Sequence, residues 1–102
     1  MEIRTGQTIY ENIVSVDADN NPISATTFDI VTYKDGALFY GILISVNLID
    51  DSRGIFSASW SADTTGEYQM YFKNNSTNVI FMSDSVSVLP DSAFENNIYI
   101  GL

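Results

Sequence analysis

Three oxygen-bearing side chains alternate in the sequence just after the first apolar run: Asp17, Asp19 and Asn21. Carboxylate and amide oxygens at this spacing open the calcium loop of EF-hand proteins. The pattern fails further along, because Pro22 stands where that loop needs a glycine and Phe28 where it needs a bidentate glutamate. Two interpretations follow: a hairpin loop built from turn-forming residues, or a weak metal site whose ligands are Asp17, Asp19 and Asn21.

Side chains suited to catalysis are scarce. The chain has no histidine and no cysteine, so no Ser–His or Cys–His nucleophile pair can form and zinc loses its usual ligands. Close carboxylates occur as Asp17 with Asp19 and as Asp50 with Asp51, but both pairs fall in predicted turns. A domain this small would struggle to build a substrate cleft around them. We therefore expect a protein that is not an enzyme and that uses no cofactor.

The charge of the chain restricts its partners. Its 102 residues suit one domain, and its formal net charge is −9 with only four lysines and arginines. Phosphate-rich partners require clustered cations, so we expect no nucleic-acid partner and no membrane partner. No basic segment followed by an apolar run begins the chain, and its longest apolar stretch, 37–46, is too short to span a bilayer. Synthesis and folding in the cytoplasm are expected.

Short strands separated by turns account for most of the sequence. Val, Ile, Thr, Tyr and Phe recur throughout, and turn-forming residues return at roughly the 8–12-residue spacing of antiparallel strands. No segment has the apolar period of a helix. Strands are predicted at 8–16, 26–34, 37–49, 54–60, 68–73, 79–82 and 86–88, with Asp35-Gly36 as a hairpin turn.

The third of these runs is unusually long. Its even positions are all apolar or aromatic, which predicts one buried face made of Leu38, Tyr40, Ile42, Ile44, Val46 and Leu48. Gly41 interrupts the run and marks either a bulge or a switch of the chain from one sheet to another.

Aromatic residues divide into a predicted core and a predicted surface. Alternation places Phe28, Trp60, Tyr68, Phe72 and Phe81 in the core. The opposite face of the strands carries Tyr33, Phe39 and Tyr71, which with Leu43 suggest an exposed contact patch. For Phe39 a second interpretation stays open, in which a bulge at Gly41 turns the ring inward.

The segment after Pro90 forms a separate unit in this interpretation, with a sandwich domain at 1–90 and an arm or edge strand at 91–102. The arm ends in apolar residues that alternate, and its predicted contact residues are Ile98, Tyr99, Ile100 and Leu102. Such a segment either pairs at the edge of its own sheet or adds a strand to a neighbouring subunit. We favour the neighbour.

Two resemblances narrow the class. The segment Gly66-Glu67-Tyr68-Gln69-Met70 resembles the tyrosine corner of immunoglobulin-like sandwiches, with Met70 where antibody domains carry a cysteine. The preceding strand, 54–60, resembles the strand before that corner, a pattern common in bacterial and phage immunoglobulin-like modules. The acidic, cysteine-free chain, rich in Asn, Ser and Thr and ending in 97–102, also resembles accessory virion proteins of tailed bacteriophages, which decorate capsids or build necks, tails and fibres.

These resemblances imply an all-β, antiparallel immunoglobulin-like β-sandwich of about seven to eight strands with a short C-terminal arm. They imply a non-enzymatic structural subunit of a phage virion, made in the host cytoplasm, that decorates the capsid through one sheet face and its arm. The implied partners are other virion structural proteins of capsid or tail, and a second copy of this chain is a further candidate. The alternative is a tail, neck or fibre module that recognises a host-surface glycan, with Tyr33, Phe39 and Tyr71 as stacking platforms, or another virion protein.

Overall fold

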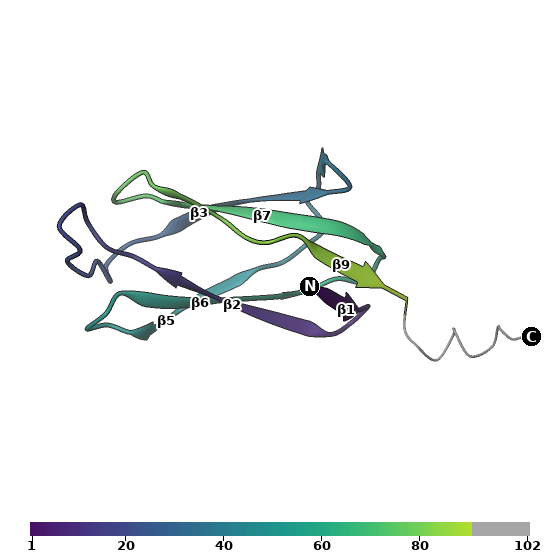
Figure 1. Cartoon of the computed structure of the whole chain (residues 1–102), viewed down its shortest axis with the longest axis horizontal. Helices are drawn as coiled ribbons and strands as arrows, with labels where there is room; N and C mark the ends of the chain where they lie inside the picture. Colours follow the sequence, from purple (N-terminus) through teal and green to yellow (C-terminus); the bar gives the residue numbers. More distant parts are fainter. Residues whose placement is uncertain (91–102) are drawn as a thin grey trace, which may run out of the picture.

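The computed structural model describes residues 1–90, and the predicted arm at 91–102 lies outside the described part. Within residues 1–90 the secondary structure consists of nine strands and no helix, which confirms the all-β class (Figure 1). The strands are β1 (Glu2–Arg4), β2 (Thr8–Val14), β3 (Phe28–Lys34), β4 (Ala37–Leu38), β5 (Ser45–Asp50), β6 (Ile55–Ser61), β7 (Gly66–Asn74), β8 (Ile80–Met82) and β9 (Val86–Leu89).

Two sheets lie one above the other and form a sandwich (Figure 1). Sheet A has the order β1-β9-β7-β3-β4, with β8 also beside β7, and sheet B has the order β2-β6-β5. Antibody constant domains place strands A, B, E and D in one sheet and C, F and G in the other. Here β2, β6 and β5 stand in the order of B, E and D, and β3, β7 and β9 in the order of C, F and G. Sheet A is mixed rather than purely antiparallel, because β1 pairs with β9 in parallel.

The core comes from the alternation of β6 and β7. Every second residue of each strand is buried: Phe56, Ala58 and Trp60 on β6, and Tyr68, Met70 and Phe72 on β7. Trp60 and Tyr68 meet across the sandwich with ring centroids 5.7 Å apart. The serines between the buried residues of β6 point outward, as expected of a strand with one buried face.

Tyr68 also ties the turn between β6 and β7 to the core. Its hydroxyl donates to the backbone carbonyl of Thr64 at 2.8 Å and lies 2.8 Å from the Thr64 hydroxyl. A hydrogen bond from this tyrosine to the backbone a few residues upstream defines a tyrosine corner. The corner expected at Gly66–Met70 is therefore present, and Met70 is fully buried at the expected place.

A second polar tie joins the sheets near the other end of β7. The buried Asn74 side chain donates through Nδ2 to Ser15 Oγ at 2.7 Å, just beyond the end of β2. Its Oδ1 accepts from Thr26 Oγ1 at 2.8 Å and from the Ser76 backbone N–H at 2.9 Å. Because both ends of this amide are hydrogen-bonded, its burial carries no unmet polar group.

The long third run does not form one strand. β4 pairs with β3 in sheet A, β5 pairs with β6 in sheet B, and residues 39–44 carry the chain from one sheet to the other. Of the two interpretations of Gly41, the sheet switch is correct. The switch and the short β1, which no sequence pattern indicated, raise the strand count to nine.

The predicted buried face of this run is wrong in part. Ile42, Ile44 and Val46 pack against the core, but Leu38, Tyr40 and Leu48 are exposed, Tyr40 by 87%. Alternation predicts one buried face only while a strand stays in one sheet, and this segment changes sheets and lies at the edge of both. Phe81 was also expected in the core and is exposed, because β8 is an edge strand whose inner side is only partly covered.

Replacing Tyr68 with phenylalanine tests the corner. Tyr68→Phe keeps the ring and removes the hydroxyl bonded to Thr64, so we expect the free energy of unfolding to fall by about 1–2 kcal/mol. Urea unfolding followed by tryptophan fluorescence measures this, since Trp60 lies against the substituted ring. Tyr10→Phe on the outer face of sheet B, where Tyr10 is 70% exposed, is the matched control and should change stability by less than about 0.5 kcal/mol. Equal effects of the two substitutions would contradict the role of the corner.

Candidate interaction surface

An apolar surface covers the outer face of sheet A, away from the core. We call it the outer patch. Its residues come from four neighbouring strands and are joined by the register of the sheet: Tyr33 stands opposite Leu38, Val31 opposite Tyr71, and Tyr71 opposite Met82. Ile80, two residues from Met82 on the same side of β8, completes it. The outer patch is thus Val31, Tyr33, Leu38, Tyr71, Ile80 and Met82.

The aliphatic members of the outer patch are strongly exposed. Val31, Leu38, Met82 and Ile80 are between 41% and 60% accessible to solvent. Tyr33 and Tyr71 are half-buried between them and pack edge-to-face with ring centroids 5.5 Å apart. Side chains of this size on neighbouring strands make one continuous apolar area, which on soluble proteins commonly marks a binding site.

Polar groups border the outer patch on one side. Asp29 and Lys73 stand opposite each other across β3 and β7. The Asn75 amide donates to Asp29 Oδ1 at 3.2 Å and to Thr27 Oγ1 at 2.9 Å, which holds that carboxylate in place. Together with Tyr33 and Tyr71 these borders enclose a shallow depression of about 340 Å³, lined by Asp29, Val31, Tyr33, Tyr71, Lys73 and Ile80.

The other predicted contact residues do not join this surface. Phe39 turns inward and packs edge-to-face on Tyr68 at 5.9 Å, so the inward interpretation of its ring is correct and the contact-patch interpretation is wrong. Leu43 is 88% exposed, but it lines a different depression with Ser61, Asp63 and Thr64. The arm residues Ile98, Tyr99, Ile100 and Leu102 lie outside the described part of the chain.

Four of the six residues of the outer patch are not indicated as surface contacts by the sequence. Tyr33 and Tyr71 are indicated, because β3 and β7 alternate regularly. Val31 shares the outward parity of Tyr33, and this signal could have located it. Leu38 was assigned to a buried face, and Ile80 and Met82 belong to a run in which every residue is apolar, so alternation cannot tell its two sides apart.

The Asp17 loop is closed by its own backbone. Asp17 Oδ1 accepts from the backbone N–H of Asp19 at 2.8 Å and of Asn21 at 2.9 Å, and Oδ2 accepts from the Asn21 amide at 3.2 Å. These bonds form an Asx turn and lower the pKa of Asp17 from its ordinary value of 3.8. They favour the hairpin-loop interpretation over a metal site at Asp17, Asp19 and Asn21, and residues 1–90 contain no cluster of three or more metal-ligating acidic residues.

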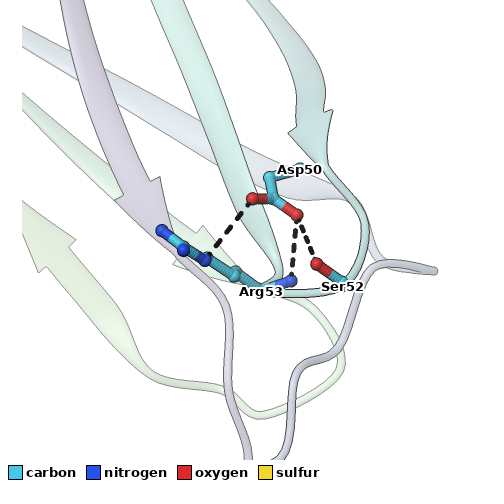
Figure 2. A network of polar contacts seen from close by, with 3 residues as sticks. All are labelled: Asp50, Ser52 and Arg53. Carbon is cyan, nitrogen blue, oxygen red and sulfur yellow. Dashed lines mark hydrogen bonds and ion pairs between the residues drawn. The ribbon is translucent and has the colours of Figure 1, made fainter.

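Asp50 closes the turn between β5 and β6 in the same way (Figure 2). Its Oδ1 accepts from Ser52 Oγ at 2.7 Å and from the Arg53 backbone N–H at 3.2 Å, and its Oδ2 lies 3.7 Å from Arg53 Nε. The hydrogen bond from Ser52, followed by the backbone bond and the charge of Arg53, lowers the pKa of Asp50. The second carboxylate pair considered for catalysis, Asp50 with Asp51, is therefore part of a turn.

One carboxylate points toward the core. Glu11 stands on the inner side of β2 between Ile9 and Ile13, and its Oε1 is buried without a hydrogen-bond partner. Burial raises the pKa of Glu11 above its ordinary value of 4.5, and the charge of Asp84 raises it further. Trp60 Nε1 faces the carboxylate without reaching hydrogen-bond geometry, and its attraction offsets part of the rise.

No known protein family has a model that matches this chain, and no curated protein is significantly similar to it in sequence. The class of the protein therefore follows from its own fold and surface. It is an all-β sandwich with an exposed apolar sheet face. Residues 1–90 include no helix long and apolar enough to cross a bilayer.

The role of Asp17 can be tested by its pH dependence. Because the pKa of Asp17 is lowered in the folded state, its charged carboxylate stabilises the fold at pH values above 3.8. This contribution is lost as the pH falls through the lowered pKa. We therefore expect Asp17→Ala to lower the thermal midpoint near neutral pH and the difference from wild type to vanish in acid. Asp19→Ala, which removes a carboxylate but none of these bonds, is the control. Added calcium should leave the wild-type midpoint unchanged, and a rise would restore the metal interpretation.

Glu11 should show the opposite pH dependence. Because its folded pKa is raised, stability is highest with the carboxyl protonated and decreases as the pH rises above 4.5 through the raised value. Glu11→Gln should remove this decrease and leave the protein at least as stable as wild type near neutral pH. Glu2→Gln, at an exposed position of β1, controls for the lost charge. Denaturant unfolding across the pH range measures both, and a destabilised Glu11→Gln at neutral pH would contradict this account.

Proposed function

We propose that this protein is a non-enzymatic structural subunit of a tailed-phage virion, and most specifically an auxiliary protein that decorates the capsid. It docks through the outer patch of sheet A and through the arm at 91–102. The observation that carries the proposal is the outer patch itself, six apolar and aromatic side chains gathered on one sheet face of an acidic protein. The resemblance of the chain to phage immunoglobulin-like modules supplies the setting.

An exposed apolar sheet face of this kind is unfavourable in water. Covering Val31, Leu38 and Met82 with another surface lowers the free energy of the system, by about 25 cal/mol for each Å² of apolar area removed from water. Interfaces are also enriched in tyrosine and methionine relative to the rest of a protein surface, and Tyr33 and Tyr71 occupy the centre of the outer patch. A standard interface buries about 800 Å² per partner, so the outer patch can form the centre of one.

The distribution of charge also supports docking through the outer patch. The formal net charge is −9, whereas the outer patch itself carries no charged side chain and is bordered by the opposite charges Asp29 and Lys73. Binding through this face therefore removes few charges from water and leaves the acidic remainder exposed. An acidic outer surface keeps particles soluble and apart.

Co-sedimentation with capsids that lack the protein tests this function. Wild type should bind the particles, and Tyr71→Ala and Met82→Asp should each weaken binding about 30-fold or more, as the loss of a central contact worth about 2 kcal/mol does. Tyr10→Ala, on the outer face of sheet B, is the matched control and should bind normally. Thermal midpoints near that of wild type establish that the variants are folded. Normal binding by both outer-patch variants, or no binding by wild type, would refute capsid decoration through this face.

A second function is favoured by one observation, the depression that combines two tyrosines with polar groups. Tyr33 and Tyr71 lie beside Asp29 and Lys73, and aromatic rings next to hydrogen-bonding groups suit a sugar ring. A tail, neck or fibre module that recognises a host-surface glycan would use this site. Glycan-array binding by wild type that is lost in Tyr71→Ala and kept in Tyr10→Ala would select this function, and immunogold labelling of tails rather than heads would agree with it.

A further inference from the structure

The edge strand β8 is apolar on both sides and open to solvent. Val79, Ile80, Phe81 and Met82 are between 39% and 62% exposed, although none carries a polar side chain. Within residues 1–90, β8 pairs only with β7, so its other edge has no partner there. Ile80 and Met82 contribute to the outer patch, and Phe81 lies on the inner side beside Phe72.

The backbone groups on the free edge of β8 can be assigned. Asn74 N–H donates to the Val79 carbonyl, and Ser83 N–H donates to the Met70 carbonyl, so residues 79 and 83 face β7. Peptide groups of an antiparallel pair alternate between facing the partner and facing away. The N–H and C=O groups of Ile80 and Met82 therefore point away from β7, and an added strand would meet them.

The other strand edges carry features that discourage pairing. β1 has charged side chains at Glu2 and Arg4, β2 has an inward-pointing charge at Glu11, and β5 has a bulge between Leu48 and Asp50. β4 spans only Ala37–Leu38. Charges, bulges and very short strands are the means by which soluble proteins prevent edge pairing. Among the described strands, the edge of β8 is short but lacks both a charge and a bulge, which makes it the most favourable place for strand addition.

The chain contains one segment outside the described residues that matches this edge. Residues 96–102 carry no charged side chain, and Ile98, Ile100 and Leu102 alternate with Tyr99 and Gly101. In an extended segment the three aliphatic side chains would share one face. An uncharged, alternating segment is what an apolar strand edge with free N–H and C=O groups recognises, since the backbone supplies the pairing and alternate side chains supply the packing.

We propose that residues 96–102 of a second copy of this chain add a strand to β8, with Ile98, Ile100 and Leu102 extending the row of Ile80 and Met82. This inference rests on the proposed function, because it names how copies contact one another on the particle. Cross-strand pairing places the added side chains directly beside the outer patch and enlarges it.

Chain length favours a second copy over the same molecule. Residues 83–90 lead from β8 to the start of the arm, so an arm of residues 91–102 that returned to its own β8 would retrace this length. At about 3.4 Å per residue the retraced stretch takes about 27 Å of the arm's reach of about 40 Å, and about four residues would remain to pair. The edge of β9 that faces away from β7 is already paired with β1. An arm from a neighbour has no such length to retrace.

Disulfide trapping tests the inference directly, because the sequence contains no cysteine. Met82→Cys and Ile100→Cys chains are mixed at high concentration and oxidised under mild conditions. We expect a mixed disulfide dimer at least about tenfold in excess over the control pair, Tyr10→Cys with Ile100→Cys. Adding Ile80→Pro to the Met82→Cys chain removes one N–H aimed at the added strand without disturbing pairing to β7, and should reduce the mixed dimer several-fold. Its thermal midpoint shows whether it is folded.

Three results would overturn the inference. The first is no mixed dimer above control. The second is a dominant dimer of Met82→Cys with itself, which indicates β8–β8 pairing. The third is an intramolecular disulfide in an additional chain that carries both Met82→Cys and Ile100→Cys. Particle binding is measured separately with the wild-type chain, because Met82 belongs to the outer patch and its replacement alone is expected to weaken binding. Normal particle binding without the mixed dimer refutes the arm contact and leaves the proposed function standing, whereas the mixed dimer without particle binding does the reverse.

Discussion

The packing of the two sheets against each other depends on the contact between Tyr68 and Trp60. Tyr68 belongs to β7 and Trp60 to β6, so their packing joins sheet A to sheet B beside the turn that connects these strands. The bond from the Tyr68 hydroxyl to Thr64 fixes the turn that connects these same strands. One side chain thus takes part both in the packing between the sheets and in the path of the chain between them. From this pair the core continues along the strands to Met70, Phe72, Ile13 and Phe56.

The strand that builds the core also builds the surface. β7 directs Tyr68, Met70 and Phe72 inward, and the residues between them, including Tyr71, outward. Because the two sets alternate on one rigid strand, the buried row holds the exposed row in position. The outer patch is therefore preorganised by the core, and a partner that binds it need not order a loop. Rigid presentation of this kind lowers the entropy lost on association.

The carboxylates whose pKa values are shifted fall into two kinds. Asp17 and Asp50 close turns with hydrogen bonds from their own backbone and are stabilised as charged groups. Glu11 points inward and is destabilised as a charged group. A charged carboxylate therefore stabilises or destabilises the fold according to the number of hydrogen-bond donors around it. Glu11 also places a charge on the inner side of an edge strand, where it discourages pairing of β2 with another strand.

The sequence by itself determined the all-β class, the burial of alternate residues on β6 and β7, the tyrosine corner and the hairpin at Asp35-Gly36, whose residues adopt the positive φ values that such a turn needs. These features depend on neighbours along the chain or on the two-residue period of a strand. It also identified Tyr33 and Tyr71 as outward-facing. It did not determine the sheet switch at 39–44, the inward turn of Phe39, the exposure of β8, or the joining of Leu38 and Met82 into one surface. Those depend on which strands stand next to one another and which lie at an edge, and only the tertiary structure decides that, because pairing joins residues that are far apart in the sequence.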